Sequence, residues 1–419
     1  MFIRLIRDHI GVFVLLGIYL LVNLWFLVEH PGSIFNEPER FGEEISLYGS
    51  RDASLYAKMA WQIIHEGIYG YNANHSNAYV TPGQPLYLVA IFKTAEILHT
   101  NHIMLTRLCN MFLNLGIVVL IYNISIRLFR RRTIGLLAAI LYCLHIAPLH
   151  YFRTTLTEIP AIFFFLLSLY IFLLALDSEK YRFHVLFGIV ASITLMFRAT
   201  PAPLLLLGWG IILKREGLYH GIKIGLIWCI GPLLIMGPWV VRNILLFQQM
   251  YLFSSHAGDP FLAGANAFYL EEHGELLKEA KERGLSSEEY GRVKAAEGFQ
   301  NDFPLYFSWY TIGKIIWLFV DKAGNPEGLG PYSDYFFEWL KIFFKWQNIL
   351  TVAIAFISIF CFRKNKGFVF VSIMVLLYIA ISNVFLTIPR YGFFIYPVIC
   401  VITGYGLVQC WINVVKRFS

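Results

Sequence analysis

Charged residues are scarce in this chain of 419 amino acids. Asp, Glu, Lys and Arg together make up 15% of it, whereas hydrophobic residues make up 58% and the mean hydropathy is +0.60. Soluble domains carry about 25% charged and about 45–50% apolar residues. An apolar excess of this size is too large to be buried in the core of a water-soluble protein. The composition therefore excludes a soluble enzyme, a disordered chain and a small disulfide-bonded scaffold.

Cysteine pairs and nucleotide-binding motifs are also absent from the sequence. The six cysteines lie in or at the ends of apolar runs and form no CxxC motif, so we expect buried free thiols and no disulfide or zinc framework. No GxxxxGK[ST] loop for a nucleoside triphosphate occurs. The net charge is +7, but no basic stripe with interleaved aromatic residues stands outside the apolar runs, so we expect no nucleic-acid partner.

Long hydrophobic runs are abundant, and they predict an all-α polytopic membrane protein with about ten transmembrane helices. The expected spans are residues 10–28, 103–127, 134–150, 159–176, 184–198, 201–213, 222–241, 344–361, 367–386 and 393–413. The first span follows Arg4 and Arg7, and the sequence after Val28 is a poor cleavage site, so we expect an uncleaved anchor. Clusters of Lys and Arg follow the second, fourth, sixth, eighth and tenth spans. The positive-inside rule therefore predicts that both termini are cytoplasmic in a plasma or inner membrane.

This topology leaves two long extracytoplasmic loops and only short cytoplasmic ones. The predicted units are the anchor (1–28), the first outer loop (29–102), the transmembrane core (103–241), the second outer loop (242–343) and the C-terminal spans (344–419). The apolar segment 84–98 contains Lys93 and Glu96, and counting it as a span would place the next basic cluster outside. We therefore expect an interfacial helix there. Any chemistry is expected at the outer face, on a substrate that is already activated.

The first outer loop contains a candidate catalytic acid. Ser50 to Gly67 predicts one helix, with Ser50 as the N-cap and Gly67 as the stop signal. Asp52 then lies in the first turn, where the helix dipole favours its charged form and leaves a carboxylate able to accept a proton. Tyr56 belongs to an apolar face suited to the membrane surface. The alternative is that Asp52 only caps the start of the helix.

The order of several motifs resembles that of a known family. They are "DASLYAKMAWQIIHEGIYGY" (52–71), "TPGQPLYLVAIF" (81–92), "RTTLTEIPAIFFFLL" (153–167), "MGPWVVRNILLF" (236–247), "GDPFLAGANAFY" (258–269) and "IPRYGFFIYPV" (388–398). This set resembles the GT-C superfamily of integral-membrane glycosyltransferases, in the branch of the protein O-mannosyltransferases and the lipid A aminoarabinose transferase. The resemblance departs at Arg51 and Asp52, where relatives show paired acids, and at Thr81, where a lysine is usual.

The resemblance implies a GT-C-like fold and a glycosyltransferase that uses a polyprenyl-phosphate-linked sugar as donor. The acceptor hydroxyl would belong to a lipid, a glycan or a protein, and membrane lipids would surround the enzyme. It implies Asp52 as the general base of a direct, inverting displacement, and Glu158 as a second acid that orients the acceptor or donor sugar. No cofactor and no metal are expected. The alternative for Glu158 is stabilisation of a helix start, with Thr154 or Thr157 as cap.

Arginines at the predicted outer ends of spans are candidates for binding the donor phosphate, because guanidinium groups pair with phosphate oxygens and keep their charge. Arg390 is the first choice and Arg242 the second. Further substrate-binding candidates are Arg153, Arg198, Tyr391, Tyr56 and Lys93, with His256 as a weaker one. The alternatives for each arginine are contacts with lipid headgroups or pairing with Glu158.

The second outer loop is the part that looks most like a soluble protein. It predicts a charged helix over 271–283, a capping box from Ser286 to Glu289 that opens a helix through Phe299, and an aromatic interfacial helix over 303–319. The main alternative to an enzyme is a polytopic transporter or lipid-sugar flippase, but no internal repeat or mid-span charge supports it. A third possibility is a non-catalytic relative that kept the fold.

Overall fold

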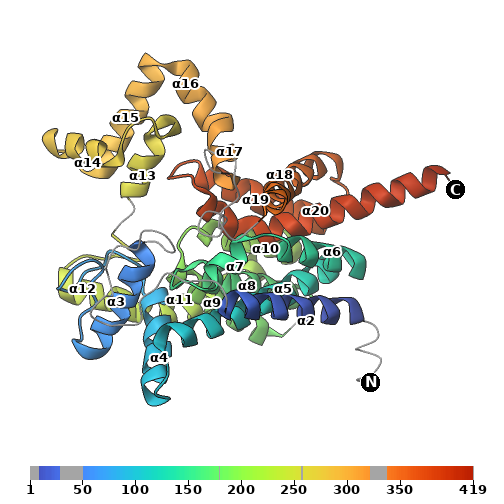
Figure 1. Cartoon of the computed structure of the whole chain (residues 1–419), viewed down its shortest axis with the longest axis horizontal. Helices are drawn as coiled ribbons and strands as arrows, with labels where there is room; N and C mark the ends of the chain where they lie inside the picture. Colours follow the sequence, from blue (N-terminus) through green and yellow to red (C-terminus); the bar gives the residue numbers. More distant parts are fainter. Residues whose placement is uncertain (1–8, 29–50, 179, 256–257, 321–336, 419) are drawn as a thin grey trace.

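The computed structural model describes residues 9–28, 51–178, 180–255, 258–320 and 337–418, which form helices joined by short connections (Figure 1). No β-strand occurs within these ranges. Arg4, Arg7, Ser50 and His256, for which the sequence made predictions, lie outside the described residues.

Six helical segments of the described chain are long and apolar enough to cross a membrane. They are α2 (Ile10–Val28), α5 (His102–Phe129), α8 (Glu158–Leu176), α10 (Ala202–Trp228) with α11 (Ile230–Ile235), α18 (Glu338–Cys361) and α20 (Pro389–Phe418). Shorter apolar helices are α6 (Arg132–Cys143), α9 (Tyr181–Phe197) and α19 (Lys366–Ser382). The predicted class, an all-α multi-pass membrane protein, is confirmed, while the number of ten spans stays a prediction.

Helix α10 is folded back on itself at Gly217. This glycine has φ +83° and ψ 172° inside the helical stretch, a conformation that glycine adopts without steric cost. The indole of Trp209 before the bend donates to the carbonyl of Gly221 after it, at 2.8 Å. The two arms therefore lie side by side, and the bend falls between the spans predicted at 201–213 and 222–241, whose separate crossings of the membrane stay a prediction.

Helices α3 (Arg51–His65) and α4 (Gly83–Ile97) belong to the segment predicted as the first outer loop and pack against each other. The sequence predicted that the apolar face of α3 lies on the membrane surface. In the structure this face packs against protein instead, since Ala60 is fully buried and Tyr56 and Ile64 pack partly buried against the main core. Helix α4 is not among the described helices that qualify as membrane spans, and its interfacial position stays a prediction.

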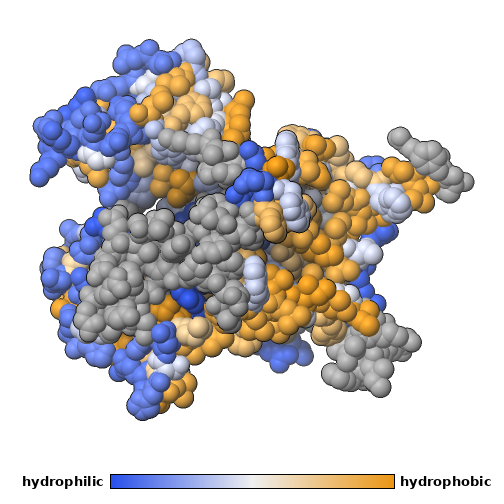
Figure 2. Space-filling model, in the orientation of Figure 1, coloured by the Kyte–Doolittle hydropathy of each residue, from blue (hydrophilic) through white to orange (hydrophobic). Residues whose placement is uncertain are grey.

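The predicted second outer loop contains α13 (Gly258–Ala265), η2 (Ala267–Tyr269), α14 (His273–Glu282), α15 (Ser287–Asn301), α16 (Phe303–Ser308), the π turn η3 (Trp309–Gly313) and α17 (Lys314–Phe319). In Figure 1, α13 to α16 lie apart from the main body, whereas the preceding helix α12 (Gly237–Phe247) lies beside α3. The predicted charged helix and the capping box of Ser286 with Glu289 are both present. Figure 2 shows hydrophilic residues gathered over α13–α15 and at the end of the main body where α3 and α12 lie, whereas the surface over α2 and α5 is largely hydrophobic.

The cysteines correct one expectation. All six are free, but only Cys400 is buried, while Cys229, Cys361 and Cys410 are exposed on helix surfaces. The prediction of buried thiols assumed that an apolar run points inward. A helix of a membrane protein can instead turn apolar side chains away from the protein core, and Leu226, for example, is 67% exposed.

Candidate active site

The site is built on the connection between α7 (Ala147–Tyr151) and α8, which is buried throughout. Buried backbone carbonyls need hydrogen-bond donors, and side chains from neighbouring helices supply them. Gln84 of α4 donates to Thr155 O at 2.6 Å, and Asn110 of α5 donates to Thr154 O at 2.9 Å. The Thr155 hydroxyl donates to the carbonyl of Ala53 on α3 at 2.5 Å. This connection therefore fixes α3, with its acid, against the start of α8.

Arg390, at the start of α20, joins two acids that are far apart in the sequence. Its Nη1 donates to Asp52 Oδ2 at 2.8 Å, and its Nε donates to Glu158 Oε1 at 2.5 Å. Asp52 lies in the first turn of α3 with a side chain that is 46% exposed, whereas Glu158 opens α8 and is completely buried. One guanidinium thus connects an accessible carboxylate with an inaccessible one.

A second arginine completes this cluster of charges. Arg198 follows α9, and its Nη2 lies 3.5 Å from Glu158 Oε1. Its guanidinium also lies over the ring of Tyr391, 5.0 Å from the centroid. The buried atoms Arg198 Nη1 and Glu158 Oε2 have no hydrogen-bond partner within the described protein. Such atoms are rarely left unsatisfied. Of the two side chains, that of Arg198 is the one with some exposure, 12% against 0% for Glu158, so Arg198 is the group that could donate to a polar ligand.

Thr157 holds the N-cap position of α8, but its side chain makes no capping hydrogen bond. Glu158 pairs with Arg390 and Arg198, and it also lies at the start of α8. Its position is therefore compatible both with a role in the active site and with stabilisation of the helix start. The sequence leaves pairing with Glu158 as an alternative to phosphate binding for each candidate arginine. Arg390 and Arg198 make this pairing.

Tyr71 is a member of the site that the sequence analysis did not single out. Its hydroxyl donates to Asp52 Oδ1 at 2.8 Å, and its ring stacks on Tyr79 and meets the edge of Tyr56. Burial, followed by the negative charge of Asp52, raises the pKa of Tyr71 far above its usual value. The phenol therefore stays protonated and donates. The only sequence signal was its place in the glycine- and tyrosine-rich stretch after α3.

Two predicted substrate-binding residues are placed elsewhere. Arg242 lies among aromatic rings, 4.6 Å from the centroid of Tyr69 and 5.0 Å from that of Trp239, and it donates to Asn243 Oδ1 at 2.9 Å. Lys93 is exposed on α4. The described contacts join neither side chain to Asp52 or Glu158. Arg153, in contrast, is part of the buried α7–α8 connection and is 1% exposed.

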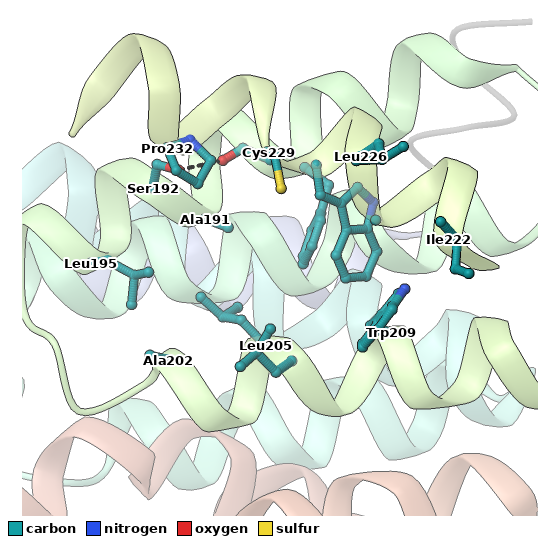
Figure 3. Close-up of a pocket in the computed structure, with 15 residues that line it drawn as sticks. Ala191, Ser192, Leu195, Ala202, Leu205, Trp209, Ile222, Leu226, Cys229 and Pro232 are labelled. Carbon is teal, nitrogen blue, oxygen red and sulfur yellow. Dashed lines mark hydrogen bonds between the residues drawn. The ribbon is translucent and has the colours of Figure 1, made fainter. Parts of the chain in front are cut away.

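A large apolar cavity is lined by residues that come before and after Arg198 in the sequence. It has a volume of about 490 Å³ and lies between α9, α10 and α11 (Figure 3). Leu195 and Ala202, which flank Arg198 in the sequence, line one end, and Trp209 and Ile222 line the other. Its walls are almost entirely apolar, so it suits a hydrocarbon chain.

Within the described residues, no three His, Cys, Asp or Glu side chains gather as a set of metal ligands. The expectation that the reaction needs no metal stays a prediction.

Comparisons with known proteins define the class of this fold. Residues 86–214 match the family model described as dolichyl-phosphate-mannose-protein mannosyltransferase. No curated protein sequence matches the chain. Among solved structures, the chain is similar to ArnT from Cupriavidus metallidurans bound to undecaprenyl phosphate, with 12% identity and a TM-score of 0.51 over 94% of this chain and 60% of that one.

Two structures of an archaeal oligosaccharyltransferase are similar as well. AglB from Archaeoglobus fulgidus, in complex with an inhibitory peptide and a dolichol-phosphate, shows 12% identity and a TM-score of 0.57 over 97% of this chain and 51% of that one. The apo form of the Archaeoglobus fulgidus oligosaccharyltransferase gives 13% identity and a TM-score of 0.55, with coverage of 97% and 51%. This chain thus spans 51–60% of the length of these proteins. The expected resemblance is confirmed: the chain has the GT-C-like fold of membrane glycosyltransferases.

Proposed function

We propose that this protein is a membrane glycosyltransferase that moves a sugar from a polyprenyl-phosphate donor to an acceptor hydroxyl at the extracytoplasmic face. The observation that carries the proposal is Arg390, held between the accessible carboxylate of Asp52 and the buried carboxylate of Glu158. The matching family model and the lipid phosphates bound by ArnT and AglB support a lipid-linked donor. The acceptor would belong to a lipid, a glycan or a protein.

In the proposed reaction, Asp52 is the general base of an inverting displacement. The acceptor oxygen bonds to the anomeric carbon, the bond from that carbon to the phosphate oxygen breaks, and its electron pair leaves with the polyprenyl phosphate. The acceptor proton goes to Asp52, which is the more exposed of the two acids.

Arg390 and Arg198 would neutralise the charge that grows on the leaving phosphate, since preorganised guanidinium groups stabilise such charge strongly. Glu158 is completely buried and contacts both arginines. We therefore assign it to positioning these guanidinium groups, and not to direct contact with a sugar. A buried carboxylate needs such partners, because a lone charge inside a protein is very costly.

The apolar cavity would receive the first isoprene units of the donor. Leu195 and Ala202, which line one end of the cavity, lie three residues before and four residues after Arg198 in the sequence. A lipid with its phosphate at the arginines would then place its first isoprene units in this cavity.

The deciding experiment uses purified protein in vesicles, polyprenyl-phosphate sugars with a radiolabelled sugar, and candidate acceptors. We expect transfer by the unmodified protein and a loss of about 100-fold or more in kcat for Asp52→Asn, as is usual when a general base is removed. Asp177→Asn is the control, because Asp177 lies beyond the other end of α8 and pairs with Arg127 at 2.9 Å. If Asp52→Asn is as active as the unmodified protein, the assignment of the base is wrong.

The same vesicles test the alternative. If no donor yields a product but labelled lipid-linked sugar crosses the bilayer, the protein is a flippase.

A further inference from the structure

A second pocket, with a basic rim and an apolar floor, lies between α8, α10 and α19. Its volume is about 670 Å³. The floor includes Leu173 of α8, Leu207 of α10 and Phe370 of α19. The rim consists of five basic residues, Lys214, Arg215, Arg363, Lys364 and Lys366.

This basic pocket lies at the opposite end of the helices from the candidate active site. Glu158 opens α8, and the pocket is lined by Leu173 and Leu176 at the end of the same helix. A helix of 19 residues is about 28 Å long, which is close to the thickness of the hydrocarbon core of a bilayer, about 30 Å. The pocket therefore lies about one membrane thickness away from Arg390, on the side where the topology predicts the cytoplasm.

The positive charge of the pocket is not neutralised within the described part of the protein. No Asp or Glu lines it, and none of its five basic residues takes part in a described ion pair. Arg215 donates to the carbonyl of Leu176 at 2.7 Å, and Arg363 lies 5.8 Å from the centroid of the Phe360 ring. Neither contact supplies negative charge. The neighbouring Arg127 differs, because it is paired with Asp177.

Two parts of the chain supply the charges. Lys214 and Arg215 lie in α10 just before its bend at Gly217, Arg363 and Lys364 belong to the connection from α18 to α19, and Lys366 is the first residue of α19. One anionic group in the pocket would therefore draw together two parts of the chain that are about 150 residues apart in the sequence, at a site whose floor is apolar.

We propose that this pocket binds an anionic phospholipid, with its headgroup phosphate among the basic residues and an acyl chain over the apolar floor. The basic rim selects negative charge, and basic pockets between transmembrane helices suit anionic headgroups. The floor of Leu173, Leu207 and Phe370 selects a lipid over a free phosphate, because a free phosphate would leave this apolar surface exposed. A bound lipid stabilises the folded state in proportion to its occupancy.

The test uses the full chain in a neutral detergent. Diphosphatidylglycerol, phosphatidylglycerol, phosphatidylcholine and inorganic phosphate are titrated, with the thermal unfolding temperature and lipid retention by native mass spectrometry as readouts. We expect both readouts to respond to the two anionic lipids, and not to phosphatidylcholine or inorganic phosphate.

A matched pair of triple variants localises the site. Lys214→Gln with Arg363→Gln and Lys364→Gln removes three charges from the rim, and Arg131→Gln with Lys180→Gln and Lys416→Gln removes three exposed charges that do not line it. We expect the first variant to bind anionic lipid roughly tenfold or more weakly and the second to change less than about twofold, because each basic group near an anionic surface contributes separately.

Equal weakening in both variants, an equal response to phosphatidylcholine, or an equal response to inorganic phosphate would overturn the proposal. If the rim variant cannot be purified, Lys214→Gln and Lys364→Gln are tested singly against Lys180→Gln. Each rim variant must then bind anionic lipid more weakly than the control.

Discussion

At the scale of single residues, the site depends on the shape of Arg390 as much as on its charge. Its Nη1 and Nε contact two different carboxylates at the same time. A lysine carries the same charge on one nitrogen and has no rigid fork. Removing one partner from a buried ion pair costs about 3–5 kcal/mol, because the other charge is left buried. Glu158 is the charge that would be left.

We therefore expect Arg390→Lys to lower kcat/KM for sugar transfer by about 100-fold, comparable to the loss of one preorganised donor at a developing oxyanion. Steady-state kinetics with a labelled donor measure this. Arg182→Lys is the control, since Arg182 is exposed in the first turn of α9. Unchanged kinetics in Arg390→Lys would show that the fork geometry is not needed.

The sequence named most members of this cluster but not their contacts. Asp52, Glu158 and Arg390 stand out because charges near predicted spans are few. Their pairing joins positions 232 and 338 residues apart, and no local pattern encodes such a contact. Arg242 and Arg390 looked alike for the same reason, since a sequence shows an arginine at the end of a span but not the aromatic rings around Arg242. Tyr71 was missed because its contact depends on the turn after α3.

At the scale of elements, α17 is anchored by a buried lysine. The Lys314 side chain is fully buried, and its Nζ donates to the carbonyls of Asn383 and Phe385 at 2.6 and 3.2 Å. It also lies 4.2 Å from the centroid of the Tyr310 ring. Burial lowers the pKa of Lys314 to about 7. This lysine therefore fixes α17 to the connection between α19 and α20, just before Arg390.

This pKa makes stability depend on pH in a known direction. Between about pH 7 and the ordinary lysine pKa of about 10.4, the unfolded chain binds the Lys314 proton and the folded protein does not. Stability then rises with pH, by at most about 1.4 kcal/mol per pH unit. We expect Lys314→Met to flatten this part of the curve of unfolding temperature against pH. An exposed control, Lys278→Met, should leave the slope unchanged. Equal slopes in all three proteins would contradict the prediction.

The cavity between α9 and α10 gives a second prediction for elements. Ala191 faces it from α9 (Figure 3), so Ala191→Phe would fill the space proposed for the donor tail. We expect KM for a full-length polyprenyl donor to rise roughly tenfold, as burial of several CH₂ groups is lost. A donor with two isoprene units should be affected much less. Leu186→Phe, on an exposed part of α9, is the control. Equal effects on both donors would show that the tail lies elsewhere.

Local patterns predicted the elements better than they predicted packing. The helix of Asp52 and the capping box at Ser286 depend on neighbouring residues, and the bend of α10 follows from a break in hydropathy at Lys214 and Arg215. In contrast, the apolar face of α3 fits a membrane surface and a protein core equally well. Only the position of α4 and the α7–α8 connection decides that it is covered by protein.

At the scale of the whole molecule, the two ends of α8 lie in different surroundings. Its start carries the candidate active site with two acids, and its end lines the pocket with five basic residues. The acid-bearing helix α3 and the hydrophilic helices α14 and α15 belong to the long loops, whereas the basic pocket occupies the short connections. Positive residues stay on the cytoplasmic side during membrane insertion. The two ends must therefore face opposite sides of the membrane if the proposed function is correct.

Thiol labelling tests this topology. In a background without the six native cysteines, Glu288→Cys on α15 and Lys364→Cys between α18 and α19 are treated in intact cells with a membrane-impermeant maleimide. Both positions are exposed, so each thiol reacts once the reagent reaches it. We expect Glu288→Cys to react from outside and Lys364→Cys only after the membrane is permeabilised, because the loop of Lys364 carries three basic residues within four positions. Labelling of both from the same side would contradict the single span, residues 344–361, that is predicted between them, and labelling in the reverse order would place the candidate active site in the cytoplasm.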